Sequence, residues 1–195
     1  MTRRTVCVLA LVALATAAPA LAQPAPQLVT RMKAGGLVLV MRHAHAPREV
    51  PGAATADPGN PTLERQLAAP GTADAGAVGR GLRVLAVPLS RVLVSPAFRA
   101  RQTAQHAGFA AAVEAAELGD NAASMAGVTE AQGRWLRQMA SQVPGPGNLL
   151  LITHTPNLTR AFPAWGESMA EGEVAVLQPS ADGPVLLGRI GPGGW

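Results

Sequence analysis

The sequence predicts an α/β protein, a three-layer α/β/α sandwich built on a mostly parallel central sheet. Short apolar runs alternate along the chain with segments of helical spacing, as in proteins whose parallel strands are joined by crossover helices. Three of these runs are continuous rather than alternating: LVLV at residues 37–40, RVLV at 91–94 and LLLI at 149–152. Continuous apolar runs are typical of central parallel strands, because helices cover both of their faces.

The beginning of the chain has the pattern of a secretory signal. Two arginines precede an apolar stretch at residues 6–18 that is too short to span a bilayer comfortably, and Ala20-Leu21-Ala22 fits the small-x-small cleavage pattern. We expect residues 1–22 to be a signal peptide that is removed and residues 23–195 to form a single domain, periplasmic or secreted. A membrane anchor is the alternative, but Pro19 and the cleavage pattern end the run early, so we expect no stable anchor after cleavage.

Composition excludes several classes of function. Cys7 is the only cysteine and lies in the predicted signal segment, so we expect neither a disulfide nor thiol chemistry in the mature protein. Removing Arg3 and Arg4 lowers Lys+Arg from 16 to 14 against 12 Asp+Glu, a formal charge of +2. The arginines are scattered rather than clustered, which argues against a nucleic-acid partner. The sequence leaves the oligomeric state unknown.

The elements of the first half follow from local signals. Residues 28–33 are predicted to form a short helix that Gly35-Gly36 ends, and residues 37–41 the first strand. Residues 46–61 are rich in Pro, Gly, Ala and Asp and are predicted to be a long loop, of the kind that often has a functional role. Helical periodicity predicts a helix over residues 72–86, which Pro88 ends. A short strand is predicted next at residues 91–95, followed by a second helix at residues 98–107.

The second half repeats the alternation. Residues 110–113 are a candidate third strand, and residues 114–127 are predicted to be an irregular loop or lid. Thr129 is expected to cap a helix that extends to Gln142. Residues 148–153 are predicted to form a buried strand that His154 follows, and Thr155-Pro156-Asn157 opens the next helix. Two late strands are predicted at residues 174–178 and 185–190.

Polar residues follow three of the predicted strands, where each strand gives way to a helix. Because the carboxyl ends of parallel strands meet at one edge of a sheet, we expect these side chains to converge in the crevice where ligands bind. They are Arg42, His43, Arg99, Arg101 and His154. Arginine matches phosphate oxygens with paired hydrogen bonds, and histidine can attack phosphorus or stabilise the transition state. This pattern predicts a phosphate pocket.

The three motifs together resemble those of the histidine phosphatase superfamily, which has the phosphoglycerate-mutase-like fold. Arg42-His43 match the first family motif, Arg-His-Gly, with Ala44 at the glycine as in small members that resemble phosphohistidine phosphatases. Residues 95–104 match the second motif, Ser-Pro-x-x-Arg-Ala-x-x-Thr-Ala. His154 ends an apolar strand, as in the third motif, with Thr155 at the usual glycine. The resemblance covers nearly the whole mature chain.

The resemblance implies a phosphatase that hydrolyses a phosphomonoester or related phosphoryl compound through a covalent phosphohistidine. His43 would be the nucleophile, and Arg42, Arg99 and His154 would bind the phosphoryl oxygens. Arg65, in a segment that resembles the Arg-x-Leu of small members, is expected to reach the phosphate as well. A small phosphorylated substrate is implied, with no metal and no organic cofactor.

The expected nucleophile must be neutral at the nitrogen that attacks. We therefore expect the other ring nitrogen of His43 to donate a hydrogen bond to a backbone carbonyl. The surrounding arginines should lower the pKa of His43, because like charges disfavour the imidazolium.

The general acid is the least defined part of the site. In the family it is usually a carboxylate some tens of residues after the arginine motif, and the candidates are Glu117, Asp120 and Glu130. Glu117 is the tentative choice, because it precedes Leu118-Gly119 in the predicted lid. Small members can lack this acid, which would cost roughly 10²–10⁴ in rate toward ordinary phosphomonoesters.

Two other functions remain open on the sequence. A non-catalytic or nearly inactive phosphoryl-binding protein could use the same pocket, which the lack of an obvious acid motivates. A metal-dependent hydrolase could use His43 and His45, which would face one side of a strand. A hydrolytic metal centre needs more ligands, however, and only His106 and His154 remain as histidines.

Several residues have simpler interpretations. His45 is expected to be a loop residue near the pocket, and His106 a surface or packing residue. Arg101 and Arg160 are expected on solvated helix faces. Glu171-Gly172-Glu173 is predicted to be a turn, although several small family members have a similar Gly-Glu there, which leaves a role at the rim open.

Overall fold

The computed structural model describes residues 26–47, 60–120 and 127–195. A six-stranded sheet lies at its centre, with strand order β3-β2-β4-β1-β5-β6. The pairings of β1 with β4, β4 with β2, and β2 with β3 are parallel, and those of β5 are antiparallel. The strands are β1 (Val38–Arg42), β2 (Leu89–Val94), β3 (Val113–Glu114), β4 (Asn148–Thr153), β5 (Val174–Gln178) and β6 (Val185–Ile190).

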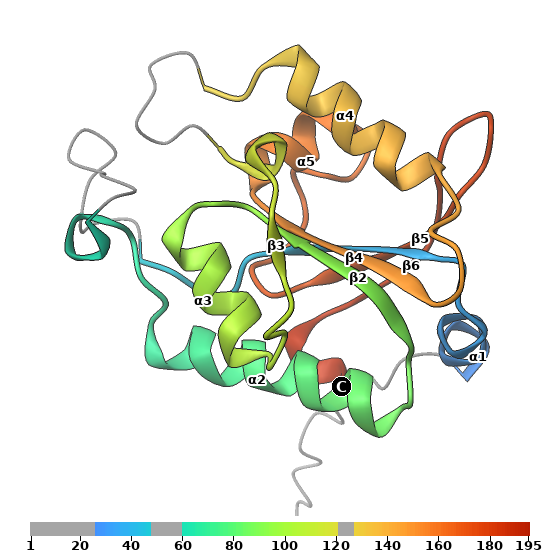
Figure 1. Cartoon of the computed structure of the whole chain (residues 1–195), viewed down its shortest axis with the longest axis horizontal. Helices are drawn as coiled ribbons and strands as arrows, with labels where there is room; N and C mark the ends of the chain where they lie inside the picture. Colours follow the sequence, from blue (N-terminus) through green and yellow to red (C-terminus); the bar gives the residue numbers. More distant parts are fainter. Residues whose placement is uncertain (1–25, 48–59, 121–126) are drawn as a thin grey trace, which may run out of the picture.

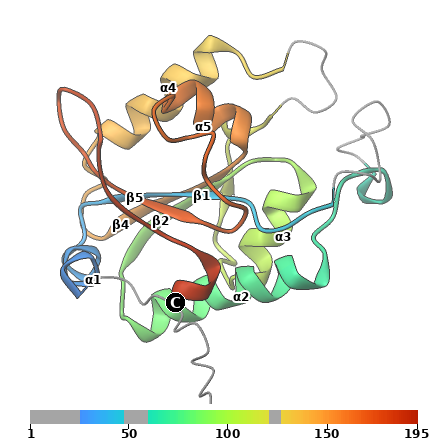
Figure 2. The same ribbon diagram turned by 180° about the vertical axis from the view of Figure 1, so that it is seen from behind.

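Helices cover both faces of this sheet, which confirms the predicted three-layer sandwich (Figure 1). In the view of Figure 1, α4 and α5 lie above the sheet, and α1, α2 and α3 lie below it; Figure 2 shows the same layers from behind. The helices are α1 (Pro26–Ala34), α2 (Ala69–Val84), α3 (Phe98–His106), α4 (Glu130–Ser141) and α5 (Thr155–Ala161), with short 3₁₀ turns η2 (Pro61–Leu63), η3 (Ala116–Leu118) and η4 (Pro192–Gly194).

Strand β1 shows why the apolar run is continuous. Leu39 and Met41 pack into the core on the side of α1, α2 and α3, whereas Val38 and Val40 pack on the side of α4 and α5. All four side chains are fully buried, because alternate residues of a strand point to opposite faces and both faces are covered.

Most predicted elements are present with shifted ends. Helix α2 begins three residues before the predicted Thr72, because Pro70 is tolerated in the first turn of a helix. The third strand is Val113–Glu114 rather than 110–113, so the start of the predicted irregular segment 114–127 belongs to the sheet. That segment also contains η3, and its residues 121–126 lie outside the described residues, as do residues 48–59 of the predicted long loop.

Local chemistry explains two other features of the helices. Thr129 caps α4 as predicted: its hydroxyl accepts from the Gln132 amide, and the Gln132 side chain accepts from the Thr129 amide at 2.9 Å. Helices α2 and α3 pack closely at Gly79, where a Cβ atom would lie 1.9 Å from the Ala107 carbonyl oxygen. None of the described helices is long and apolar enough to cross a bilayer.

Candidate active site

The strand registers bring the three sequence motifs together. Met41 and Val94 both pair with Ile152, so β1, β4 and β2 end at the same level. Beyond these ends the His43 amide donates to the Thr153 carbonyl at 3.0 Å, and the Ser95 amide donates to the Ile152 carbonyl at 3.0 Å. The polar residues that come after the strands therefore share one edge of the sheet, where β1, β4 and β2 present their carboxyl ends.

His43 is buried, and its ring has a defined tautomer. Its Nδ1 lies 2.8 Å from the Ala44 carbonyl oxygen. Because a carbonyl oxygen only accepts, Nδ1 carries the proton and Nε2 keeps its lone pair. Arg99 Nε donates to that Nε2 at 3.3 Å. The predicted hydrogen bond to a backbone carbonyl is therefore present, and the unprotonated Nε2 faces Arg99.

The surroundings favour the neutral form of His43. Burial lowers its pKa well below the ordinary histidine value, and the neighbouring His154 and the guanidinium of Arg99 lower it further. The hydrogen bond to Ala44 opposes this shift, and Arg42 contributes in the lowering direction. The like-charge effect predicted from the sequence is present, but desolvation is the larger cause.

Arg99 is the centre of the site. Its side chain is 1% exposed, and its guanidinium contacts both histidines: Nε lies against His43, and a terminal nitrogen is 2.9 Å from His154 Nδ1. The same terminal nitrogen forms an ion pair with Asp120. A fully buried arginine that joins two histidines is positioned to bind an oxyanion between them.

His154 faces Arg99 with one nitrogen and Ser95 with the other. Its Nε2 lies 2.7 Å from the Ser95 hydroxyl oxygen. Burial lowers the pKa of His154 well below its ordinary value, with further contributions from Arg99, Arg65 and Arg42. The rings of His43 and His154 are 5.0 Å apart between centroids, so the two predicted catalytic histidines are neighbours.

Arg42 enters the site from the end of β1. One terminal nitrogen donates to the Met169 carbonyl at 2.7 Å, and the other lies 3.2 Å from a Glu171 carboxylate oxygen. Its charge acts on both His43 and His154. The structure thus gathers the four principal predicted residues, Arg42, His43, Arg99 and His154.

Arg65 lies at the margin of this group. Its Nε donates to the Pro47 carbonyl at 2.9 Å, and its guanidinium also donates to the Ala46 carbonyl. The charge of Arg65 lowers the pKa of His154. Arg65 is therefore near enough to the site to act on it electrostatically, while it fixes the chain just after His45.

The three candidate acids separate clearly in the structure. Asp120 pairs with Arg99 and lies 3.7 Å from His154 Nδ1. Glu117, the tentative choice, lies in η3, where its carbonyl oxygen accepts from the Asn157 side chain at 3.1 Å. Glu130 forms an ion pair with Arg160 at 2.5 Å near the start of α4. Of the three carboxylates, Asp120 is the one in contact with site residues.

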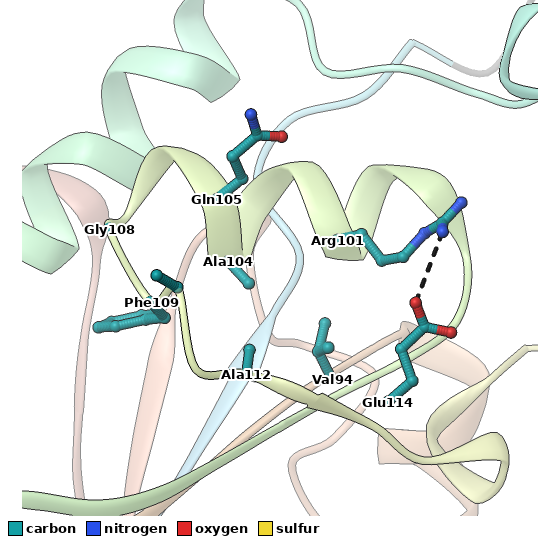
Figure 3. Close-up of a pocket in the computed structure, with 9 residues that line it drawn as sticks. Val94, Arg101, Ala104, Gln105, Gly108, Phe109, Ala112 and Glu114 are labelled. Atoms are coloured by element: carbon teal, nitrogen blue, oxygen red, sulfur yellow. Dashed lines mark hydrogen bonds and ion pairs between the residues drawn. The ribbon is translucent and has the colours of Figure 1, made fainter.

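Arg101 and His106 lie outside the group formed by Arg42, His43, Arg99 and His154. Arg101 lies 3.5 Å from Glu114, and its guanidinium carbon lies over the Phe98 ring, 5.4 Å from the ring centroid. It stands at one end of a hollow of about 300 Å³ between α3 and β3 (Figure 3). His106 is exposed at the end of α3. Among the described residues, no three histidine, cysteine, aspartate or glutamate side chains lie close enough to hold a metal ion.

Solved structures of similar shape span nearly all of their own chains and most of this one. The protein histidine phosphatase SixA, solved with tungstate, has a TM-score of 0.57 at 22% identity, covering 80% of this chain and 97% of that one. The chain has the histidine phosphatase fold. A SixA from Agrobacterium tumefaciens has a TM-score of 0.56 at 21% identity, covering 80% of this chain and 99% of that one. The phosphoserine phosphatase of Entamoeba histolytica, solved with phosphoserine, has a TM-score of 0.57 at 13% identity, covering 80% of this chain and 97% of that one. Both share the histidine phosphatase fold. No protein-family model matches the chain, and no curated protein matches it in sequence.

Two hydroxyl residues support the site on this histidine phosphatase fold without having been singled out from the sequence. Ser95 holds His154, and Thr103, fully buried in α3, accepts from the Ala44 amide at 3.1 Å while donating to the Arg99 carbonyl at 2.8 Å. Both lie at fixed positions of the Ser-Pro-x-x-Arg-Ala-x-x-Thr-Ala motif. That signal was present in the sequence, although their hydrogen-bond partners were not predictable from it.

Thr103→Val is expected to lower the free energy of unfolding by about 1–3 kcal/mol, because it leaves the buried Ala44 amide without an acceptor. Chemical denaturation measures this difference. Thr103→Ser keeps the hydroxyl and is the matched control. Equal stability of the valine and serine variants would contradict the role assigned to this hydrogen bond.

Proposed function

We propose that this chain is a phosphatase that transfers the phosphoryl group of a small substrate to His43 and then to water. One observation carries the proposal. A buried, neutral histidine presents an unprotonated Nε2 beside a buried arginine that also contacts a second histidine. This arrangement supports the proposal, because covalent phosphoryl transfer requires a nucleophile and oxyanion-binding groups around one position.

In the first step, Nε2 of His43 attacks phosphorus, and the bond from phosphorus to the leaving atom breaks. Arg42 and Arg99 hold the phosphoryl oxygens and offset the charge that spreads over them in the transition state. His154 can donate to an oxygen from Nδ1 when the proton is on that nitrogen. Ser95 accommodates this, because its hydroxyl either accepts from or donates to Nε2.

Asp120 is the residue to which we assign proton transfer, in place of the tentative Glu117. Its carboxyl group lies against Arg99 and close to His154, where a bound phosphoryl group would compete with it for the arginine. Displaced from Arg99, a protonated Asp120 would donate its proton to the leaving atom. As a carboxylate it would then accept a proton from the water that attacks phosphohistidine, which restores free His43 and releases phosphate.

The substrate class that we propose is a small phosphomonoester or a phosphoramidate. The site offers arginines and histidines for the phosphoryl group, and the structural neighbours include a protein histidine phosphatase and a phosphoserine phosphatase solved with phosphoserine. The reaction as proposed uses no metal. Turnover of an aryl phosphate by the purified protein tests the activity, and we expect EDTA to leave the rate unchanged.

Asp120→Asn is expected to slow the hydrolysis of an alkyl phosphate by roughly 10²–10⁴, because the poor leaving group requires protonation. The rate with an aryl phosphate that has a good leaving group should fall much less. Steady-state kinetics with the two substrates measures this difference, and Glu117→Gln is the matched control. A Glu117→Gln variant with the selective defect, beside a normal Asp120→Asn variant, would contradict the assignment.

We also propose that the protein acts after export. The pattern of residues 1–22 supports this, with two arginines, an apolar stretch and a small-x-small site. Sequencing of the amino terminus of the mature protein tests it, and we expect the first residue to be Gln23. A mature protein that retains Met1 would contradict the proposal.

A further inference from the structure

Arg42 also belongs to a second ionic cluster, which it forms with Glu171 and His45. One carboxylate oxygen of Glu171 is 3.2 Å from the Arg42 guanidinium, and the other is 2.6 Å from His45 Nδ1. The side chains of Arg42 and Glu171 are 13% and 19% exposed, whereas that of His45 is 47% exposed. One carboxylate therefore connects a phosphoryl-binding arginine to a histidine that is open to solvent.

The backbone fixes Glu171 in this position. The Gly172 amide donates to the carbonyls of both Arg42 and His43, at 3.2 and 3.0 Å, and the Arg42 amide donates to the Glu173 carbonyl at 3.1 Å. Gly172 has a φ of +76°, which favours glycine. The segment around Glu171 is thus attached to the end of β1 rather than free to move away from Arg42.

The backbone of His45 is held equally closely. Its carbonyl accepts from the Ala68 amide at 3.1 Å, and a Cβ atom at Gly71 would lie 2.2 Å from the same carbonyl oxygen. The first turn of α2 therefore packs against the chain at His45. Both ends of the Glu171 bridge are held by their backbones, so a change of charge at His45 acts on Glu171 in a fixed geometry.

The charged groups around His45 come from four parts of the chain. Glu171 contacts His45 from the segment before β5, and Arg42, at the end of β1, contacts the other oxygen of the Glu171 carboxylate. Asp74 faces His45 from α2: burial raises the pKa of Asp74, and the charge of His45 lowers it. Arg65 fixes the neighbouring Ala46 and Pro47 carbonyls. A proton taken up by His45 therefore lies beside two carboxylates.

We propose that Glu171 is a positioning residue for Arg42 and that it transmits the protonation of His45 to the phosphoryl-binding site. When His45 is neutral, the full charge of Glu171 acts on Arg42, so a bound oxyanion competes with this carboxylate for the guanidinium. When His45 is charged, it shares the charge of Glu171, and Arg42 attracts the oxyanion more strongly. Histidine is the side chain whose charge normally changes between about pH 5 and 8.

This inference rests on the proposed function, since it assumes that Arg42 binds the phosphoryl oxygens. Its test uses sulfate, because sulfate remains a dianion over this pH range whereas phosphate titrates. Affinity is measured by calorimetry at about pH 6 and about pH 8. We expect wild-type protein to bind sulfate more tightly at the lower pH, and His45→Gln to reduce that gain by roughly two- to fivefold, the size of a partly exposed ion pair.

A double-mutant cycle identifies Glu171 as the connection. In a Glu171→Gln background, His45→Gln should cause no further change in the pH dependence. Glu173→Gln is the matched control, because it removes the same charge from the same segment but its side chain pairs with Arg189; it should keep the wild-type pH dependence. Glu171→Asp, which keeps the charge on a shorter side chain, should retain only part of the coupling if the glutamine variant does not fold.

The inference is overturned if His45→Gln keeps the wild-type pH dependence, if its effect persists in full without Glu171, or if wild-type protein binds no sulfate. The proposed function is tested separately by turnover of an aryl phosphate. Turnover without coupling contradicts this inference alone, whereas coupled sulfate binding without turnover contradicts the proposed function alone.

Discussion

Replacing His43 by asparagine is expected to lower turnover by on the order of 10⁴-fold or more, because we propose that this residue supplies the attacking nitrogen. The asparagine amide can still donate to the Ala44 carbonyl that His43 now contacts at 2.8 Å, so the fold should be preserved. Arg42, Arg99 and His154 remain in the variant, and it should still bind sulfate. Steady-state kinetics with an aryl phosphate, together with calorimetry, measures both quantities.

The separation of binding from turnover is the informative part of this result. A variant that loses both could simply be misfolded, which circular dichroism and a thermal unfolding curve would reveal. His45→Gln is the comparison on the same segment, because His45 lies at the rim and contacts Glu171 rather than Arg99. Turnover by His43→Asn within about tenfold of the wild-type rate would contradict the assignment of the nucleophile, since a lost nucleophile costs far more.

Replacing Arg99 by methionine is expected to reduce kcat/KM by roughly 10³-fold, the typical cost of removing a donor to the oxyanion in a transition state. Methionine fills much of the same volume without charge. Sulfate affinity should fall as well, because Arg99 contacts both histidines from a buried position. Arg99→Lys keeps the charge but not the planar pair of donors, so we expect it to restore binding only in part.

The same variant changes the pH behaviour of the nucleophile in a predictable direction. The positive charge of Arg99 lowers the pKa of His43, so its removal should raise that pKa. Because the neutral imidazole is the reactive form, the acid limb of the pH–rate profile should move to higher pH in Arg99→Met. An NMR titration of the His43 ring measures the same shift without turnover. An unchanged or lowered pKa would contradict the electrostatic account.

The principal site residues were predictable because their positions depend on strand ends. A continuous apolar run identifies a central strand, and parallel strands place the residues beyond their carboxyl ends at one edge of the sheet. Arg42, His43 and His154 needed no more than this, and Arg99 lies in the first turn of the helix after β2. The effect of arginine charges on the pKa of His43 was predictable for the same reason, because Arg42 and Arg99 lie with His43 at one edge of the sheet.

The carboxylates were not predictable in the same way. Asp120 reaches Arg99 because η3 turns the chain back across the end of β4, where Leu118 and Gly119 carbonyls accept from Thr153 and Asn157 side chains. Glu171 reaches Arg42 through backbone hydrogen bonds between segments far apart in sequence. Neither placement has a local pattern, so Glu117 was as plausible as Asp120, and Glu171 was predicted to lie in a turn, with a role at the rim left open.

Trapping the covalent intermediate tests the central claim most directly. Wild-type protein is mixed with an aryl phosphate, quenched in alkaline denaturant because phosphohistidine is labile to acid, digested, and mapped by mass spectrometry, with His43→Asn treated in parallel. We predict that the wild-type peptide containing His43 gains the mass of one phosphoryl group on that residue and that the variant gains none. Sustained turnover without a phosphorylated peptide, or a phosphoryl group on His45 or His154 instead, would contradict the account.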